Sequence, residues 1–197
     1  MFKITYNKSL IFIVTFCGTG LLSKRMPGTI GSLAATSLSY IIPKYSVLFY
    51  VTSILLFVIG TITSQQYVNQ HPENKDPGFI VIDEACAIFL SNAILLNIFE
   101  YSYTVFLLSF IFFRVFDILK PWPIKKIDSY FKQLDINSNQ KVQSICNDYN
   151  KHCNKYGYKM FLNGFGIMID DVVAVIPTII IIIIMSYIMQ EYCVFGY

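Results

Sequence analysis

The sequence is poor in charge. Of its 197 residues, Lys, Arg, Asp and Glu make up only 14%, whereas hydrophobic residues make up 55%. Soluble domains usually carry about 25% charged residues, so a free soluble enzyme is not expected. The hydrophobicity argues against disorder, and the net charge of +3 is too small and dispersed for a nucleic-acid-binding protein. The composition predicts a membrane protein, and the length suits one domain over residues 1–197.

The sequence also lacks the motifs of several common sites. It has five cysteines without a Cys-x-x-Cys pair and two distant histidines, His71 and His152, so neither a zinc site nor a disulfide framework is expected. No Cys-x5-Arg loop, no Asp-x-Asp and no Gly-x4-Gly-Lys-Ser/Thr loop occurs. These absences exclude cysteine phosphatases, the usual aspartyl-phosphate chemistry and P-loop enzymes.

Long uncharged stretches divide the sequence into segments. They cover residues 9–23, 26–43, 45–63, 85–99, 101–113 and 172–190. A membrane-spanning helix needs about 20 apolar residues, a length that only 45–63 and 172–190 approach comfortably. The shorter stretches are predicted as short spans, re-entrant elements or buried helices. The pattern predicts an all-α, multi-pass helical membrane bundle.

Most polar residues gather in the connections between these stretches, at 23–28, 73–84, 114–159 and 164–171. Two apolar stretches separate the first connection from the second and the second from the third, so an even number of crossings returns the chain to the same side. Twelve of the fifteen Lys and Arg residues then lie on this shared face, against Lys3, Lys8 and Lys44 on the other. This bias predicts one polar active face, in the cytoplasm.

The third connection contains a basic polar insert, residues 129–163. The wider segment 125–159 holds seven lysines and three aspartates. One interpretation is a solvated, partly helical insert. The other is a patch held near anionic lipid headgroups, where each nearby cation contributes about 1 kcal/mol.

Two acidic doublets open apolar stretches: Asp83 with Glu84, and Asp170 with Asp171. Acids at a helix N-terminus stabilise the helix, so capping is one explanation. Two doublets on one face, together with Asp117 and Asp76, are more than capping needs. Crowded carboxylates repel one another unless a cation joins them, and oxygen ligands suit Mg²⁺.

Two further groups are candidates for binding phosphate. Arg114, Asp117 and Lys120 are spaced to follow one side of a helix that Pro121 should end. They form either a structural salt bridge or a phosphate clamp. Residues 26–32 combine small and hydroxyl side chains at a helix start, where exposed amides can bind phosphate, although the same pattern is also an ordinary turn.

Four blocks of the sequence, in this order, resemble the phosphatidylglycerophosphatase A family: PGTIGS (27–32), DPGFIVIDE (76–84), FRVFDILKPWPIKKID (113–128) and GFGIMIDD (164–171). The third block is the most specific. With the flanking apolar stretches, the resemblance covers nearly the whole chain except 132–160. It implies a Mg²⁺-dependent phosphatase of the bacterial inner membrane. Such an enzyme converts the phospholipid phosphatidylglycerophosphate to phosphatidylglycerol and inorganic phosphate.

On this interpretation each candidate residue has an expected role. The expected magnesium ligands are Asp83, Asp117, Asp170 and Asp171. The expected catalytic residues are Asp83, Asp171 and Glu84, with Glu84 as the base or as a residue that holds the metal's ligands in place. The expected substrate-binding residues are Arg114, Lys120, Gly28, Thr29 and Ser32. Either water or a carboxylate could be the nucleophile.

Two other kinds of protein remain as alternatives. A small transporter or channel could use intramembrane acids to carry ions, and a noncatalytic membrane scaffold could use them to cap helices. No inverted repeat is visible, and the acids lie at the ends of the apolar stretches, which disfavours a transporter. Release of phosphate from lipid would separate the three.

Overall fold

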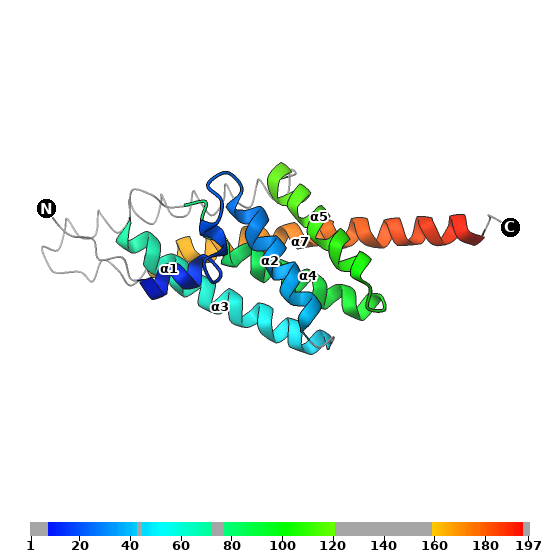
Figure 1. Ribbon diagram of the computed structural model, residues 1–197, viewed down its shortest axis with the longest axis horizontal. Helices are drawn as coiled ribbons and strands as arrows, with labels where there is room; N and C mark the ends of the chain where they lie inside the picture. The colour runs from blue at the N-terminus through cyan, green and yellow to red at the C-terminus, as the bar shows by residue number, and fades with distance from the viewer. Residues whose placement is uncertain (1–7, 43–44, 72–76, 121–158, 195–197) are drawn as a thin grey trace, which may run out of the picture.

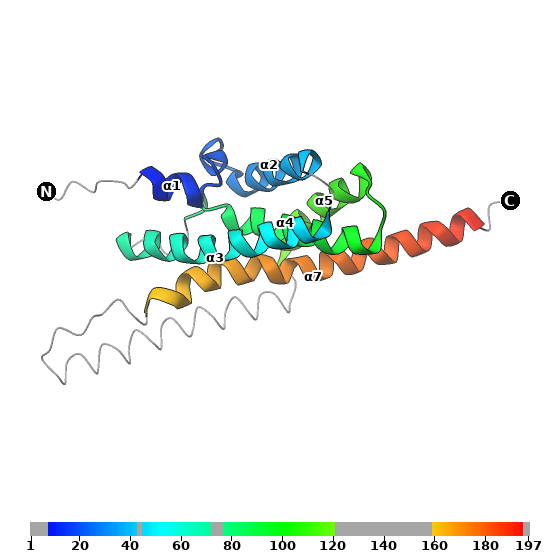
Figure 2. The same cartoon turned by 90° about the horizontal axis from the view of Figure 1, so that it is seen from below.

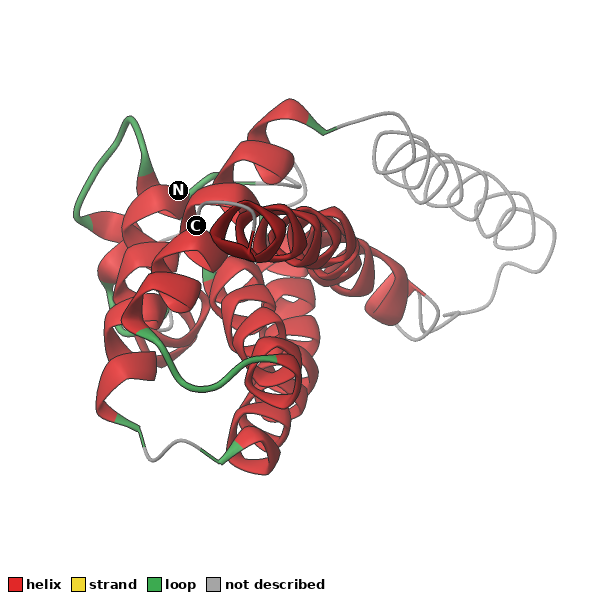
Figure 3. Cartoon of the chain, turned by 90° about the vertical axis from the view of Figure 1, so that its right-hand side faces the viewer, coloured by secondary structure: helices red, strands yellow, loops and turns green. Residues whose placement is uncertain are grey.

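The computed structural model describes residues 8–42, 45–71, 77–120 and 159–194. These ranges form helices joined by loops and turns, without a strand, as the end-on view of Figure 3 shows. The helices are α1 (Lys8–Val14), the short 3-10 helix η1 (Thr19–Leu21), α2 (Pro27–Ile41), α3 (Ser46–Gln70), α4 (Ile82–Ile98), α5 (Tyr103–Leu119) and α7 (Lys159–Val194). The predicted all-α class is confirmed.

Local sequence explains several of the helix ends. Pro27 begins α2, where its missing N–H costs nothing. Ser102 caps α5 by accepting a hydrogen bond from the Thr104 N–H at 3.3 Å. Helix α5 ends at Leu119, which confirms the predicted stop before Pro121, because a residue before proline is disfavoured in the helical conformation. Lys120 follows in a left-handed conformation with φ 39°.

Helix α4 lies at the centre of the bundle. It packs against α3, α7, α2 and α5, and its side chains from Ala85 to Phe89 are all buried. Figures 1 and 2 show α3 and α7 running alongside α4, with α2 and α5 completing the bundle and the C-terminal part of α7 projecting beyond it. Because α2 and α3 form one return and α4 and α5 another, the start of α4 meets the start of α2 and the end of α5.

Within the described ranges, two helices are long and apolar enough to cross a membrane: α3, with 25 residues, and residues 164–190 of α7. These correspond to the two stretches of sufficient length in the sequence. Helices α2, α4 and α5 have 15, 17 and 17 residues, or about 22–26 Å at 1.5 Å per residue, less than a hydrocarbon core of about 30 Å. The expectation of short helices beside the long ones is confirmed.

Helix α3 has the polarity of a helix that faces lipid. Val47, Ile54 and Leu55 on its outside are 69%, 61% and 55% exposed, whereas Ser53 and Gln65 on its inside are buried. Soluble proteins bury apolar side chains and expose polar ones, so this arrangement fits an apolar surrounding in which polar groups find partners between helices.

The N-terminal apolar stretch is not the single short span that its length allowed. Residues 9–23 divide into α1, a turn in which Phe16, Cys17 and Gly18 all have positive φ, and η1. Leu10 of α1 shares a core cluster with Tyr67 near the end of α3. Helix α1, which begins at Lys8, also contacts the start of α4, because the Val81 N–H donates to the Val14 carbonyl at 3.0 Å. The side of the membrane on which Lys8 lies stays a prediction.

Part of the sequence interpretation lies outside the described residues. This applies to Asp76, to the KPWP segment beyond Lys120, and to the predicted insert up to residue 158. Residues 159–163, the end of the predicted insert, belong to the first turns of α7.

Candidate active site

Four helices bring the motif blocks to one place. Helix α2 supplies Gly28 from its first turn, α4 supplies Asp83 and Glu84 from its first turn, α5 supplies its last turns, and α7 supplies Asp170 and Asp171. The hydrogen bonds and ion pairs described below join these elements over up to 50 residues of sequence. The expectation that the blocks share one site is therefore met among the described residues.

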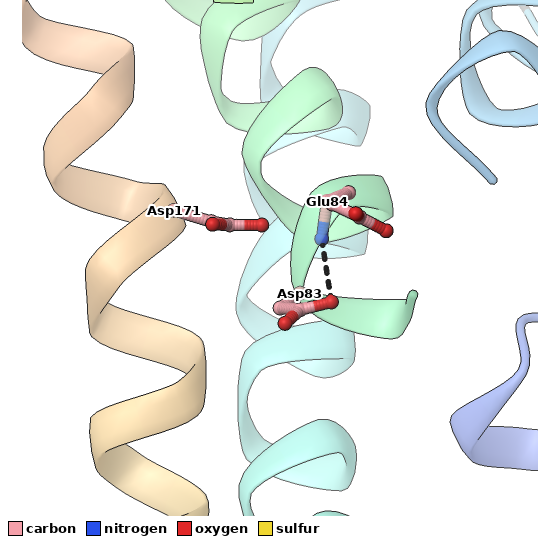
Figure 4. Close-up of side chains that lie close together, drawn as sticks. All are labelled: Asp83, Glu84 and Asp171. Carbon is pink, nitrogen blue, oxygen red and sulfur yellow. Dashed lines mark hydrogen bonds between the residues drawn. The ribbon is translucent and has the colours of Figure 1, made fainter. Parts of the chain in front are cut away.

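Three carboxylates form the centre of the site. Asp83, Glu84 and Asp171 each place one oxygen so that all three lie within 4.8 Å of one another (Figure 4). The Glu84 N–H donates to Asp83 Oδ1 at 3.0 Å, which fixes one side of the cluster. Glu84 Oε2 and Asp171 Oδ2 are buried without a hydrogen-bond partner among the described residues. Buried polar atoms of this kind call for a cation or an ordered water.

The electrostatics of Glu84 reflect this crowding. Burial raises the pKa of Glu84 well above its ordinary value, and the negative charge of Asp171 raises it further. The positive charge of Arg114 acts in the opposite direction but is the smaller influence. A cation placed between these carboxylates would relieve both the desolvation and the repulsion.

The second acidic doublet is not where the sequence predicted it. Asp170 and Asp171 lie inside α7, eleven and twelve residues after Lys159, and not at a helix start. The helix runs through Gly164, where α7 lies close to α3. The Gly164 N–H donates to Gln65 Oε1 at 2.8 Å, and a Cβ atom at this position would overlap the Thr61 carbonyl oxygen. Capping therefore cannot explain the second doublet.

Arg114 connects the acid cluster to the end of α5. Its Nη1 donates to Glu84 Oε1 at 3.2 Å and to Asp117 Oδ2 at 2.7 Å. The structural salt bridge considered from the sequence is thus present, with a second acid added to it. All of these bonds use Nη1, and the buried Nε–H has no acceptor among the described residues. The edge of the guanidinium formed by Nε and Nη2 makes no hydrogen bond to the described residues, and such an edge can donate to a bidentate acceptor.

Lys120 and Asp170 form a second ion pair, between Lys120 Nζ and Asp170 Oδ2. Lys120 follows the last residue of α5, so this pair joins the end of α5 to α7. Asp117 and Asp170, two of the four expected magnesium ligands, thus contact cationic side chains. Asp83 and Asp171, the other two, lie in the carboxylate cluster together with Glu84.

The three expected substrate-binding residues of α2 differ in their surroundings. Gly28 lies against Glu84 and Arg114. Thr29 is half-buried in the same turn, and the completely buried Ser32 donates its hydroxyl back to the Gly28 carbonyl at 2.7 Å. Their role in binding substrate stays a prediction.

Sequence reasoning missed the contribution of α3. Gln65 is 1% exposed, and besides accepting from Gly164 it donates to Asn69 Oδ1 at 2.9 Å. These contacts fix α7 against α3 just before the acidic doublet. The available signal was the polar run Ser64-Gln65-Gln66 directly after the apolar stretch, which water-facing residues would also produce.

The donor set fits a hard divalent cation. Asp83, Glu84 and Asp171 offer only carboxylate oxygens, which are the ligands that Mg²⁺ accepts, and two of those oxygens have no hydrogen-bond partner in the described part of the chain. A guanidinium edge lies beside them and suits phosphate. Fold and site together define a helical membrane protein with an acidic, arginine-containing polar site.

Comparison with known proteins identifies the family. A sequence profile of the family described as phosphatidylglycerophosphatase A matches residues 12–136. The chain is also 31% identical over 187 residues to the phosphatidylglycerophosphatase A of Haemophilus influenzae, a match that covers 94% of this chain and 93% of the relative. No solved structure matches the chain significantly. The chain belongs to the phosphatidylglycerophosphatase A family, and it is an enzyme of the phosphatase class.

Proposed function

We propose that this protein hydrolyses the phosphate monoester of phosphatidylglycerophosphate, releasing inorganic phosphate and phosphatidylglycerol. Family membership and the name of the Haemophilus relative support the substrate. The structural observation that carries the proposal is Arg114. Its Nη1 is held by Glu84 and Asp117, while its buried Nε–H has no acceptor among the described residues. A phosphate that accepts from this edge would lie next to the carboxylate cluster.

Arg114 and Lys120 have distinct roles in this proposal. The Arg114 guanidinium orients the phosphate by bidentate hydrogen bonds, which its planar geometry favours. Lys120, whose side chain is 37% exposed in its pair with Asp170, adds a positive charge at the end of α5. Gly28, Thr29 and Ser32 remain further candidates for contact with the substrate.

Magnesium is the proposed cofactor. Asp83 and Asp171 would hold it, with Glu84 as a further ligand or as the base, because these carboxylates converge within 4.8 Å. When bound, the ion polarises the phosphoryl group and lowers the pKa of coordinated water. Glu84 is placed to accept a proton at its carboxylate, and Arg114 beside it stabilises negative charge on the phosphate oxygens. Whether water or a carboxylate attacks phosphorus stays open.

Phosphate release by the purified protein tests the function directly. In mixed micelles containing phosphatidylglycerophosphate, the wild type should release phosphate, which neither a transporter nor a scaffold would do. Arg114→Lys keeps the charge but loses the bidentate edge, so kcat should fall about 10²- to 10³-fold. Arg25→Lys, at an exposed arginine, is the matched control and should retain activity. A well-folded Arg114→Lys protein with normal turnover would reduce Arg114 to a salt-bridge residue.

Removal of metal tests the cofactor. A chelator should abolish phosphate release, and added Mg²⁺ should restore it. Binding of Mn²⁺, followed by electron paramagnetic resonance without substrate, should weaken strongly in Asp171→Asn. Full activity in excess chelator, or unchanged Mn²⁺ binding by that variant, would contradict the magnesium proposal.

The proposed location is the bacterial inner membrane with the site at the cytoplasmic face. Single cysteines in a cysteine-free background test this orientation: Lys24→Cys lies just before α2, and Glu100→Cys lies in the exposed turn between α4 and α5, at the opposite end. In intact spheroplasts an impermeant thiol reagent should label position 100 and spare position 24. The reverse pattern would invert the orientation.

A further inference from the structure

The backbone conformation at Gly28 does not explain why this residue is a glycine. It is the second residue of α2 and is buried. Among the glycines that the structure describes, only Gly18 has a positive φ, so an L-amino acid could adopt the conformation of Gly28. Alanine also favours a helix more than glycine does. The requirement for glycine at this position must come from its surroundings.

The surroundings of Gly28 are side chains of the site. A Cβ atom at this position would overlap Glu84 Oε1 and would lie 2.8 Å from Glu84 Cδ and 3.1 Å from Arg114 Nη1. The carboxylate of Glu84 therefore rests on the bare backbone of α2. The same oxygen, Oε1, accepts the hydrogen bond from Arg114 at 3.2 Å. Any side chain at residue 28 must displace this ion pair.

We propose that Gly28 is a positioning residue that gives the Glu84 carboxylate its place between Arg114 and Asp171. Without the space over Gly28, Glu84 cannot reach Arg114 Nη1 and keep its oxygen in the carboxylate cluster. The first turn of α2 thus acts on the chemistry through Glu84, in addition to any contact that it makes with phosphate. The catalytic meaning of this role rests on the proposed phosphatase function; the steric role does not.

Gly31, one turn further along α2, provides a matched comparison. A Cβ at Gly31 would lie 2.7 Å from the Cβ of Val81. Both glycines permit close packing of α2 against the region where α4 begins, but Gly31 meets an apolar side chain and Gly28 meets the ion pair. Alanine at Gly31 therefore tests packing alone.

Phosphate release provides the first test. Gly28→Ala should lower kcat about 10²-fold with little change in KM, since a displacement of about 1 Å in a reacting group has an effect of this size. In a Glu84→Asp background, where the carboxylate is withdrawn by one methylene, Gly28→Ala should cause little further loss. Gly31→Ala should be improved by Val81→Ala and not by Glu84→Asp. Equal losses from Gly28→Ala in both Glu84 backgrounds would overturn the proposal.

Thermal unfolding provides a second test that needs no activity, so it separates this proposal from the proposed function. Gly28→Ala should lower the melting temperature of the purified wild-type chain. In a Glu84→Ala background it should raise the melting temperature, because the overlap is gone and the helix propensity of alanine remains. If Gly28→Ala alone does not fold, the double variant still should. A Gly28→Ala substitution that destabilises both backgrounds equally would refute the positioning role, even if phosphate release is found.

Discussion

The two acidic doublets look alike in sequence but lie in different structural contexts. Asp83 and Glu84 are in the first turn of α4, where the helix dipole favours negative charge. Asp170 and Asp171 are inside α7, with helix on both sides and less than a tenth of each residue exposed. The first doublet has a local explanation in the helix that carries it. The second has none.

This difference shows where function must be sought. A buried carboxylate within a helix destabilises the protein unless a partner compensates for its desolvation. Asp170 meets Lys120, whereas Asp171 Oδ2 has no hydrogen-bond partner among the described residues. The α7 doublet is therefore the stronger indication of a ligand, although the sequence pattern treats the two doublets equally.

The largest expected effect is that of Asp171→Asn. This substitution removes one charge from the carboxylate cluster and keeps the shape of the side chain. Phosphate release should fall about 10³-fold, comparable with the loss of a transition-state contact. In chelator the variant should melt at a higher temperature than wild type, since a buried repulsive charge is gone. Activity near the wild-type level would remove Asp171 from the proposed site.

Asp170→Asn should have a smaller effect on activity. Asp170 contacts Lys120, so the change acts through that cation, and outer residues of this kind typically contribute about 10- to 100-fold. The protein should become less stable, because the charge of Lys120 loses its counter-charge. If Asp170→Asn and Asp171→Asn changed the melting temperature in the same direction, the proposed difference between these two neighbouring residues would be contradicted.

The smallest effect concerns the stability of Asp83→Asn. Loss of the carboxylate relieves repulsion in the cluster but also removes an acid from the first turn of α4, where it contributes about 0.3–1 kcal/mol. In chelator these changes should nearly cancel, so the melting temperature stays close to that of wild type. A gain as large as that of Asp171→Asn would mean that the helix dipole contributes nothing at α4.

Much of the fold was predictable because its signals are local. Apolar stretches of sufficient length identified both candidate spans, and Pro27 and Pro121 mark the start of α2 and the end of α5. The N-terminal stretch was less predictable. Its division into α1 and η1 depends on a turn at Phe16 and Cys17, residues without any usual preference for positive φ.

The residues of the candidate site could be predicted from the sequence, but the contacts between them could not. Charged residues at the ends of apolar stretches are few, so Asp83, Glu84, Arg114 and Asp171 could be selected from the sequence. The contacts that these residues make could not be predicted, because the local sequence around a carboxylate is the same whether it binds a metal or an arginine. Asp117 and Asp170, expected as ligands, contact Arg114 and Lys120.

The sequence by itself determined the helical membrane class, the two helices long enough to span a membrane and the identity of the polar residues that gather at one end of the bundle. These follow from composition and from the lengths of the apolar stretches, which are local properties of the chain. Only the tertiary structure decided that the α7 acids lie within a helix and that Gly28 makes room for Glu84. It also left the Nε–H of Arg114 without an acceptor among the described residues. Each of these depends on contacts between segments far apart in the chain. Local sequence patterns do not specify such contacts.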